Sequence, residues 1–292
     1  MTNINHKILV TGATGQLAQS LFKISKNFEC YDFKFYNKYD LDISDFKSVN
    51  RVIRDLKPTI IINCAAYTNV ELAEIKKGKA NLINCLSVGN ISEICAKNKI
   101  KLIHISTDYV FDGHSNRQYK ENDNTNPINY YGTSKLNGEK LFLNLNPPNS
   151  IIVRTSWLYS AQKNNFVGKI LYNLRNKDSF QVVNDEISSP TNSYDLANFI
   201  LKVIPKLNEI ETGIYNYSNS GYCTRFEFSK LIKFLVNGES IINKCITTED
   251  NIIKRPKFSS LDLTKTKHVF DAEFIDWKES LERFFKIYNY GL

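Results

Sequence analysis

The beginning of the chain restricts the fold more than any other segment. A short apolar strand at residues 7–10 leads directly into a glycine-containing turn, and leucines at helical spacing follow. Gly12 permits a tight bend in this turn, and Gly15 lets the backbone approach an anion closely. The N–H groups and the dipole at the start of the helix then face that anion. This order predicts a dinucleotide-binding turn. The residues predicted to contact the dinucleotide are Gly12, Thr14, Gly15, Gln16 and Leu17.

The rest of the first half of the chain alternates short apolar runs with amphipathic segments. The run at residues 60–62 is continuously apolar, as expected for a strand covered on both faces of a parallel sheet. Ser44 is the predicted N-cap of the helix before it. This alternation predicts right-handed βαβ units and an α/β fold with a Rossmann-type, doubly wound parallel sheet. The predicted strands are residues 7–10, 31–36, 60–62, 102–105, 151–153 and 214–217.

The regular alternation weakens after about Trp157, and this divides the chain unevenly. We expect an NAD(P)-binding Rossmann domain made of residues 1–156 and about 191–217. A smaller, discontinuous C-terminal substrate domain would comprise about 157–190 and 218–292. Helices are predicted in this later part at residues 166–174, 196–204, 226–235 and 277–288.

Composition and charge exclude several classes of protein. The net charge of +8 comes from lysines spread along the chain, so no basic stripe indicates a nucleic-acid partner, although the excess favours an anionic substrate. No apolar run reaches the roughly 18 residues of a membrane span. The six cysteines form no CxxC pair and the four histidines no metal-binding spacing. We therefore expect a cytoplasmic protein with free thiols, no metal site and no membrane contact.

The end of the second predicted strand carries the signal for cofactor choice. An NAD-selective site usually offers a carboxylate to the ribose 2′-hydroxyl at this point. Here the chain has Asn37 and Lys38, which tolerate a 2′-phosphate better. NADPH is therefore the favoured cofactor, and use of NADH stays open. Asp42 and Ile43, just downstream, are predicted to flank the adenine.

Three polar features follow the later strands and suit carbonyl reduction. Thr107 follows a strand, and Tyr131 and Lys135 lie four residues apart on a predicted helix, so they share one face. Reduction of a ketone needs a proton donor for the developing alkoxide, and a neighbouring ammonium lowers the pKa of a phenol. Thr107 can offer a second hydrogen bond to the carbonyl oxygen. We predict Tyr131, Lys135 and Thr107 as the catalytic residues.

These motifs resemble the extended short-chain dehydrogenases, which share the glycine turn, the Thr-Asp pair and the Tyr…Lys spacing. Further stretches resemble the dTDP-4-dehydrorhamnose reductase family in particular, nearly from end to end. The most specific of them is Ser-Thr-Asp-Tyr-Val-Phe-Asp-Gly. The stretches that carry this resemblance are residues 63–68, 73–74, 106–113, 154–159, 189–191, 255–256 and 261–262.

The resemblance implies the last step of dTDP-L-rhamnose synthesis, which supplies a precursor of cell-surface polysaccharide such as O-antigen. A hydride would pass from NADPH to C4 of dTDP-4-dehydro-β-L-rhamnose. Tyr131 would donate the proton, Lys135 would hold the nicotinamide ribose, and Thr107 would bind the substrate carbonyl. Ala65, Ala66 and Tyr67 would lie along the cofactor, with Asn84 nearby. The residues expected to face the sugar nucleotide are Thr107, Asp108, Tyr109, Trp157, Ser189, Pro190, Thr191 and Arg255.

The chain departs from the family pattern at two positions near the substrate. Glu186 stands where the family has Gln, and Ser188 where it has Gly. Tyr109 occupies the position of the second acid of sugar-nucleotide 4,6-dehydratases, which argues against dehydration. Two alternatives stay open, namely another nucleotide-sugar 4-ketoreductase and a non-catalytic, cofactor-binding regulatory subunit. A homodimer is also left open.

Overall fold

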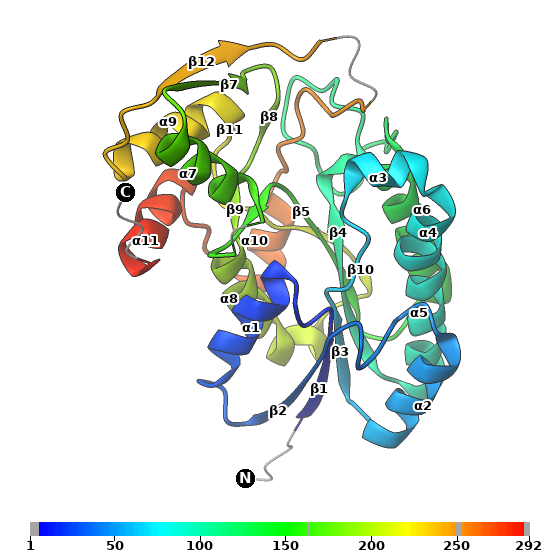
Figure 1. Cartoon of the computed structure of the whole chain (residues 1–292). Helices are drawn as coiled ribbons and strands as arrows, with labels where there is room; N and C mark the ends of the chain where they lie inside the picture. The colour runs from blue at the N-terminus through cyan, green and yellow to red at the C-terminus, as the bar shows by residue number, and fades with distance from the viewer. Residues whose placement is uncertain (1–5, 163, 249–252, 289–292) are drawn as a thin grey trace.

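A six-stranded sheet forms the centre of the structure, a computed structural model that describes residues 6–162, 164–248 and 253–288. The strand order is β10-β5-β4-β3-β1-β2, and every neighbouring pair is parallel (Figure 1). This confirms the predicted α/β, Rossmann-type fold. The strands are β1 (His6–Thr11), β2 (Tyr31–Tyr36), β3 (Ile60–Asn63), β4 (Lys101–Thr107), β5 (Ile151–Thr155) and β10 (Gly213–Asn216).

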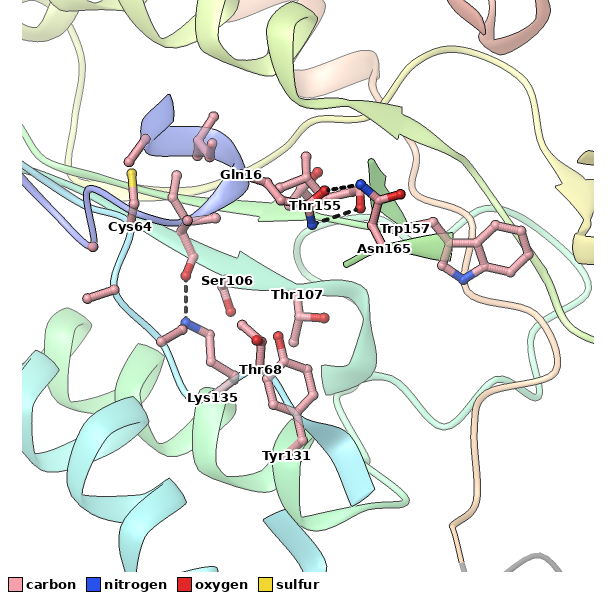
Figure 2. Close-up of a pocket in the computed structure, with 18 of the residues that line it drawn as sticks. Gln16, Cys64, Thr68, Ser106, Thr107, Tyr131, Lys135, Thr155, Trp157 and Asn165 are labelled. Atoms are coloured by element: carbon pink, nitrogen blue, oxygen red, sulfur yellow. Dashed lines mark hydrogen bonds between the residues drawn. The ribbon is translucent and has the colours of Figure 1, made fainter. Parts of the chain in front are cut away.

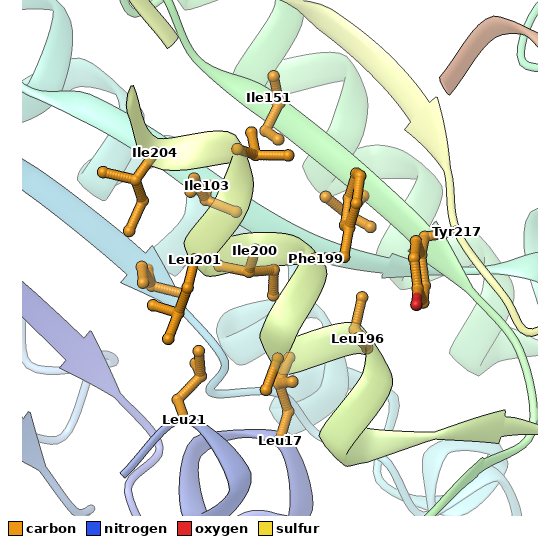
Figure 3. Close-up of a cluster of buried hydrophobic side chains, with 14 of the residues drawn as sticks. Leu17, Leu21, Ile103, Ile151, Leu196, Phe199, Ile200, Leu201, Ile204 and Tyr217 are labelled. Carbon is orange, nitrogen blue, oxygen red and sulfur yellow. The ribbon is translucent and has the colours of Figure 1, made fainter. Parts of the chain in front are cut away.

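Alternate residues of each strand enter two separate hydrophobic layers. Ile60 and Ile62 face one layer, whereas Ile61 between them faces the other. The first layer is covered by α1 (Gln16–Ser25), α8 (Ser193–Val203) and the 3-10 turn η3 (Ile204–Glu209), as Figure 3 shows. The second is covered by α2 (Phe46–Leu56), α5 (Ser87–Asn98) and α6 (Tyr130–Leu145). Burial on both faces explains why β3 is apolar without alternation.

The start of α2 differs from the prediction by one residue. The N-cap is Asp45, whose side chain accepts a hydrogen bond from Ser48 N, and not Ser44. The Ser44 hydroxyl instead donates to Asp42 Oδ1 over 2.6 Å, closing a local turn. Asp and Ser are comparable N-caps, so the residue with the free side chain takes the position.

Two short helical segments before the π-helical turn η1 (Leu82–Leu86) were not predicted. They are α3 (Val70–Ile75) and α4 (Lys77–Asn81). The lysines at residues 76, 77 and 79 hide any amphipathic pattern in this part of the sequence. Helices this short are held by tertiary contacts rather than by local propensity.

A second unit packs above the carboxyl edge of the sheet, with its own hydrophobic cluster. Its helices are α7 (Phe166–Asn176), α9 (Arg225–Leu235) and α11 (Trp277–Tyr288). β12 (Ile241–Cys245) pairs in parallel with β7 (Ser179–Val183), and β11 (Cys223–Thr224) pairs with β8 (Ile187–Ser188). β6 (Leu158–Tyr159) pairs with β9 (Thr191–Asn192). A capping box marks the start of α9. The side chain of Thr224 accepts a hydrogen bond from Glu227 N, and the side chain of Glu227 accepts one from Thr224 N.

One late helix packs against the sheet and not against the second unit. Phe270, in α10 (Thr264–Phe270), belongs to the first core layer and lies 4.9 Å from the Tyr215 ring of β10. The prediction that residues 218–292 lie together in the substrate unit was therefore wrong for this helix. Its apolar face fits the edge of the sheet at β10. No helix among the described residues has the length and hydropathy required to cross a bilayer.

Candidate active site

A cavity of about 680 Å³ lies between the carboxyl edge of the sheet and the second unit. It collects residues from the loops after β1, β3, β4 and β5 and from the first turns of α6, α7 and α9. In open α/β sheets this edge is where ligands bind. The predicted site residues that line the cavity are Gly12, Thr14, Gly15, Gln16, Leu17, Lys38, Asp42, Ile43, Ala65, Ala66, Thr107, Asp108, Tyr109, Tyr131, Lys135 and Trp157.

The glycine turn lies at the point where the strand order reverses, between β1 and β3. Gly12 has φ +69°, and a Cβ there would lie 2.8 Å from Ala65 N, so a side chain would force the two loops apart. Gly15 is the N-cap of α1 and offers no side-chain cap, which leaves the first N–H groups of the helix open to a ligand. The turn therefore fits a pyrophosphate.

A segment of the second unit covers this turn, which sequence reasoning did not anticipate. Gln16 Oε1 accepts a hydrogen bond from Ser160 Oγ (2.8 Å). It also accepts one from Asn165 Nδ2 (3.0 Å), and Figure 2 shows these two side chains together. Gln162 Nε2 donates to Thr14 O over 3.0 Å. Polar residues in a loop carry no pattern that indicates a distant partner. These contacts join the two units across the phosphate-binding turn.

At the predicted adenosine end, one of the two proposed selectivity residues lines the cavity. Lys38 lines the cavity, and its Nζ lies 3.7 Å from Asp42 Oδ2. Asn37 does not, because its side-chain oxygen accepts hydrogen bonds from the backbone N–H groups of Tyr39 (2.7 Å) and Asp40 (3.3 Å). The amide of Asn37 thus closes a turn, and Lys38 is the residue placed to meet a 2′-phosphate.

Tyr131 and Lys135 enter the cavity from the first turns of α6, as Figure 2 shows. Asn129 caps this helix, accepting a hydrogen bond from Gly132 N over 2.8 Å. A Cβ on Gly132 would lie 2.1 Å from Tyr109 O, so only glycine allows the 3-10 turn η2 (Asp108–Val110) to approach the helix. This approach brings Thr107, at the end of β4, beside the phenol of Tyr131.

The environment of Tyr131 differs from the prediction. Burial raises the pKa of the phenol well above its ordinary value, and the hydrogen bond with Thr107 only partly opposes this. The predicted lowering of the phenol pKa by Lys135 was therefore wrong, because loss of solvent around the ring is the larger effect. The phenol is protonated at neutral pH, which is the state that a proton donor requires.

Lys135 is held by the strand below it. Its Nζ donates to Ile105 O over 2.5 Å and lies 3.2 Å from His104 Nε2. The side chain is 1% exposed. Burial lowers the pKa of Lys135 to about 8, against the raising effects of Glu139 and Cys64. The lysine is still mostly charged at neutral pH and directed into the cavity.

A cluster of hydroxyl groups surrounds the buried carboxylate of Asp108. Thr107 Oγ1 donates to Asp108 Oδ1 (3.0 Å), and Asp108 Oδ2 accepts from Ser259 Oγ (2.6 Å) and Ser188 Oγ (3.3 Å). Ser188 is one of the two departures from the family pattern, and here it supplies an additional donor. Burial raises the pKa of Asp108 to about 6, despite these hydroxyl donors.

The raised pKa of Asp108 predicts that the stability of the fold depends on pH. Its pKa is about 6 in the folded chain and 3.8 in an unfolded one, so its contribution to stability is complete below about pH 4. That contribution is lost as the pH rises through 6, and the loss is about 2 to 3 kcal/mol. As the pH is raised from about 4.5 to about 7.5, we expect the melting temperature of the unchanged protein to decrease relative to that of the Asp108→Asn variant.

Asp112→Asn is the matched control for this measurement. A hydrogen bond from His114 N, among others, lowers the pKa of Asp112, so this carboxylate stabilises the fold as the pH rises. Thermal unfolding followed by circular dichroism at several pH values compares the three proteins. A difference between the unchanged protein and Asp108→Asn that does not vary with pH would contradict the prediction.

The far end of the cavity is formed by Trp157 and an arginine that was not predicted. Trp157 has φ +40°, a conformation rare for a bulky residue and frequent at functional sites. The guanidinium carbon of Arg225 lies 4.2 Å from the Trp157 ring and 4.9 Å from the Phe166 ring. Arg225 Nε donates to Glu186 Oε2 over 2.7 Å. Glu186, the second departure from the family pattern, thus holds a cation beside the predicted substrate contact.

Some residues predicted to face the substrate do not line this cavity. Ser189, Pro190 and Thr191 are buried, and Thr191 N bonds to Trp157 O (3.2 Å). This turn therefore supports Trp157 from behind. Arg255 lines an adjoining cavity, where its Nη2 lies 3.3 Å from Glu71 Oε1.

Tyr67 also lies outside the cavity lining, although Ala65 and Ala66 before it are part of that lining. Its backbone N–H and C=O both bond to the side chain of Asn84, over 2.8 and 3.0 Å. Asn84 comes from the π-helical turn η1 and so fixes the loop after β3. It supports the cofactor side of the cavity indirectly.

The comparisons with known proteins agree with this geometry. A family model described as the RmlD substrate binding domain matches residues 6–290. The chain belongs to the RmlD substrate binding domain family. The dTDP-4-dehydrorhamnose reductase of Aggregatibacter actinomycetemcomitans is 37% identical to this chain, over 94% of this chain and 97% of its own length.

The chain is also similar to solved structures and to a reductase of a related sugar. A dTDP-4-dehydrorhamnose reductase from Bacillus anthracis, solved in complex with NADP, has a TM-score of 0.92 at 37% identity, covering 97% of this chain and 100% of that one. A dTDP-4-keto-6-deoxy-D-glucose reductase from Streptomyces niveus is 35% identical over 76% of each chain. The described residues contain no cluster of three or more His, Cys, Asp or Glu side chains arranged to bind a metal.

Proposed function

We propose that this chain reduces the C4 ketone of dTDP-4-dehydro-β-L-rhamnose to dTDP-L-rhamnose, with NADPH as the hydride donor. The observation that carries the proposal is the meeting of Tyr131, Lys135 and Thr107 in one cavity with the glycine turn. The relatives named as dTDP-4-dehydrorhamnose reductases, similar over nearly the whole chain, support the choice of sugar. The NADP complex of the similar Bacillus anthracis protein supports the choice of cofactor.

Each group in the cavity has a step to perform in this reaction. When bound, NADPH supplies the hydride that reaches C4. The protonated phenol of Tyr131 donates its proton to the oxygen that becomes the C4 hydroxyl. Thr107 lies beside that phenol, and on substrate binding its hydroxyl would turn from Asp108 Oδ1 to the same oxygen. The Lys135 ammonium holds the nicotinamide ribose, and its charge assists as negative charge develops on the oxygen.

The two ligands are assigned to opposite parts of the cavity. The dinucleotide would lie along the glycine turn, the loop after β3 and Lys38, with Asp42 and Ile43 near the adenine. The sugar would lie between Tyr109 and Trp157, whose indole is at the far end of the cavity in Figure 2. Arg225 adds a partly buried cation beside that indole, which suits an anionic substrate such as a sugar diphosphate.

A reductase assay tests the proposal and its nearest alternative. Purified protein is mixed with NADPH and enzymatically prepared dTDP-4-dehydrorhamnose, and oxidation of NADPH is followed by its ultraviolet absorbance. We expect rapid turnover and dTDP-L-rhamnose as the product, identified by NMR. The Streptomyces niveus relative makes dTDP-4-keto-6-deoxy-D-glucose the second substrate to try. Faster turnover of that sugar would favour the alternative 4-ketoreductase, and no turnover of either would favour a regulatory subunit.

Lys38 is expected to set the preference for NADPH. Its side chain is 62% exposed and lines the cavity at the predicted adenosine end. Lys38→Glu should raise the KM for NADPH about tenfold and leave that for NADH nearly unchanged, because a cation that meets the 2′-phosphate is replaced by an anion. Lys34→Glu is the matched control, since Lys34 is also exposed and paired with an aspartate, outside the cavity. A strong preference of the unchanged protein for NADH would contradict this assignment.

Cellular location, assembly and domain boundaries are part of the proposal as well. A nucleotide-linked substrate and a reduced nicotinamide cofactor are both metabolites of the cytoplasm, and we place the enzyme there. A homodimer stays a prediction. The division of the chain into a cofactor domain and a substrate domain is likewise proposed, with α10 now assigned to the cofactor domain.

A further inference from the structure

A row of buried polar side chains crosses the sheet beneath the cavity. Thr11, Asn63 and His104 are register partners on the neighbouring strands β1, β3 and β4. The side-chain amide of Asn63 lies 2.6 Å from Thr11 Oγ1 through one of its polar atoms and 3.1 Å from His104 Nδ1 through the other. Each side chain is at most 1% exposed. The row begins at the phosphate-binding turn and ends at an imidazole.

The other nitrogen of this imidazole meets the catalytic lysine. His104 Nε2 lies 3.2 Å from Lys135 Nζ. Burial and the neighbouring lysine charge lower the pKa of His104 well below its ordinary value, so the ring is neutral. A neutral imidazole has one N–H donor and one acceptor nitrogen, and its tautomer follows the charge of its partners. Nε2 accepts a hydrogen bond from the Lys135 ammonium when the ring proton is on Nδ1. The Asn63 amide then presents its oxygen to Nδ1–H and its NH2 group to Thr11 Oγ1.

We propose that His104 is a positioning residue for Lys135, which keeps the lysine amino group directed into the cavity. Two adjacent residues of one strand supply the anchors, because Ile105 O and His104 Nε2 each take one of the three N–H donors of the ammonium. The third donor is left for a ligand in the cavity. The inference depends on the proposed function only through the part of Lys135 in holding NADPH.

The other titratable groups around Lys135 do not replace His104. Cys64, after β3, and Glu139, one turn further along α6, both raise the pKa of the lysine. The carboxylate of Glu139 is occupied by Arg154, at 3.0 Å and 2.7 Å. Tyr131, one turn earlier on α6, bonds to Thr107. Among the described residues, His104 is the side chain within hydrogen-bond distance of Lys135 Nζ.

Two substitutions of different length separate positioning from simple packing. His104→Asn places an amide near the position of Nδ1, where it still reaches Asn63 but falls short of Lys135. His104→Gln extends one methylene further and places a polar atom near the position of Nε2. A structural role alone would make both variants similar. A positioning role predicts loss in His104→Asn and recovery in His104→Gln.

The first readout is NADPH binding, titrated by fluorescence without any sugar. His104→Asn should weaken it about tenfold, the scale of one hydrogen bond to a charged group. The second is the pH profile of kcat/KM. Its alkaline limb should move about one unit to lower pH in His104→Asn, because the ammonium loses an acceptor and deprotonates more easily. His104→Gln and the exposed control His114→Asn should stay close to the unchanged protein.

The outcomes distinguish this inference from the proposed reaction. Unaltered binding and an unaltered pH limb in His104→Asn would overturn the positioning role, as would equal losses in the Asn and Gln variants. If His104→Asn does not fold, Asn63→Ala takes its place. A folded Asn63→Ala protein with normal NADPH binding and an unshifted alkaline limb of the kcat/KM profile would equally overturn the positioning role. A protein that binds NADPH but reduces no 4-keto sugar would refute the reaction alone.

Discussion

Tyr131→Phe is expected to lower kcat about a thousandfold while NADPH binding changes little. Positioned general acids contribute about 10² to 10⁴ to the rate, and this substitution removes the one proton that the reduction needs from a side chain. The ring itself remains, so its edge-to-face contact with Tyr109 (5.9 Å between centroids) and the packing of α6 are retained. The loss should therefore fall on kcat rather than on stability.

The neighbouring tyrosine provides the control for this experiment. Tyr130 lies one position earlier on α6, outside the cavity lining, so Tyr130→Phe should keep normal turnover. Stopped-flow or steady-state measurements of NADPH oxidation give kcat, and fluorescence titration gives the affinity for NADPH. Retention of most activity in Tyr131→Phe would remove the phenol from the mechanism. If the chain were a regulatory subunit, neither variant would alter its effect on a partner.

Lys135→Ala is expected to weaken NADPH binding at least tenfold and to lower kcat/KM about a thousandfold. The buried ammonium is placed to donate to the nicotinamide ribose, and a hydrogen bond to a charged group is worth about 1.5 to 3 kcal/mol. Its charge also favours the developing negative charge on the substrate oxygen, which adds a loss in rate. Both effects should appear together, unlike those of Tyr131→Phe.

Folding must be controlled in this case because Lys135 is 1% exposed. Alanine leaves Ile105 O without its side-chain donor and leaves an empty space beside it. Lys135→Met keeps most of the volume and removes the charge together with its N–H donors, so it should show the same kinetic losses with a smaller change in melting temperature. Lys140→Ala, at an exposed position of the same helix, should behave like the unchanged protein. Normal kinetics in both Lys135 variants would exclude the lysine from the site.

Local patterns in the sequence were sufficient to predict the sheet. The continuous apolar run of β3 and the helical spacing of Leu17, Leu21 and Ile24 each record which faces are buried. The glycine turn, Tyr131 and Lys135 were also found from spacing, because each depends on neighbours within a few residues. The short helices α3 and α4 and the capping residue Asp45 were missed, since several local choices there have similar energies.

The parts of the site that sequence reasoning missed come from pairings of residues far apart in the chain. Arg225 meets Trp157, and Ser259 meets Asp108, across separations that no local pattern records. Ser189 and Thr191 were assigned to the substrate, yet the packing of β9 on β6 places them behind Trp157. Side-chain contacts of this kind depend on how the second unit docks.

The sequence by itself therefore determined the parallel sheet, the phosphate-binding turn and the face of α6 that carries Tyr131 and Lys135. These follow from short-range sterics and from the periodic burial of apolar side chains. Only the tertiary structure decided the electrostatic state of the site. The protonated phenol of Tyr131, the neutral ring of His104 and the raised pKa of Asp108 all result from loss of solvent. Desolvation is set by everything packed around a group, and so it exists only in the folded chain.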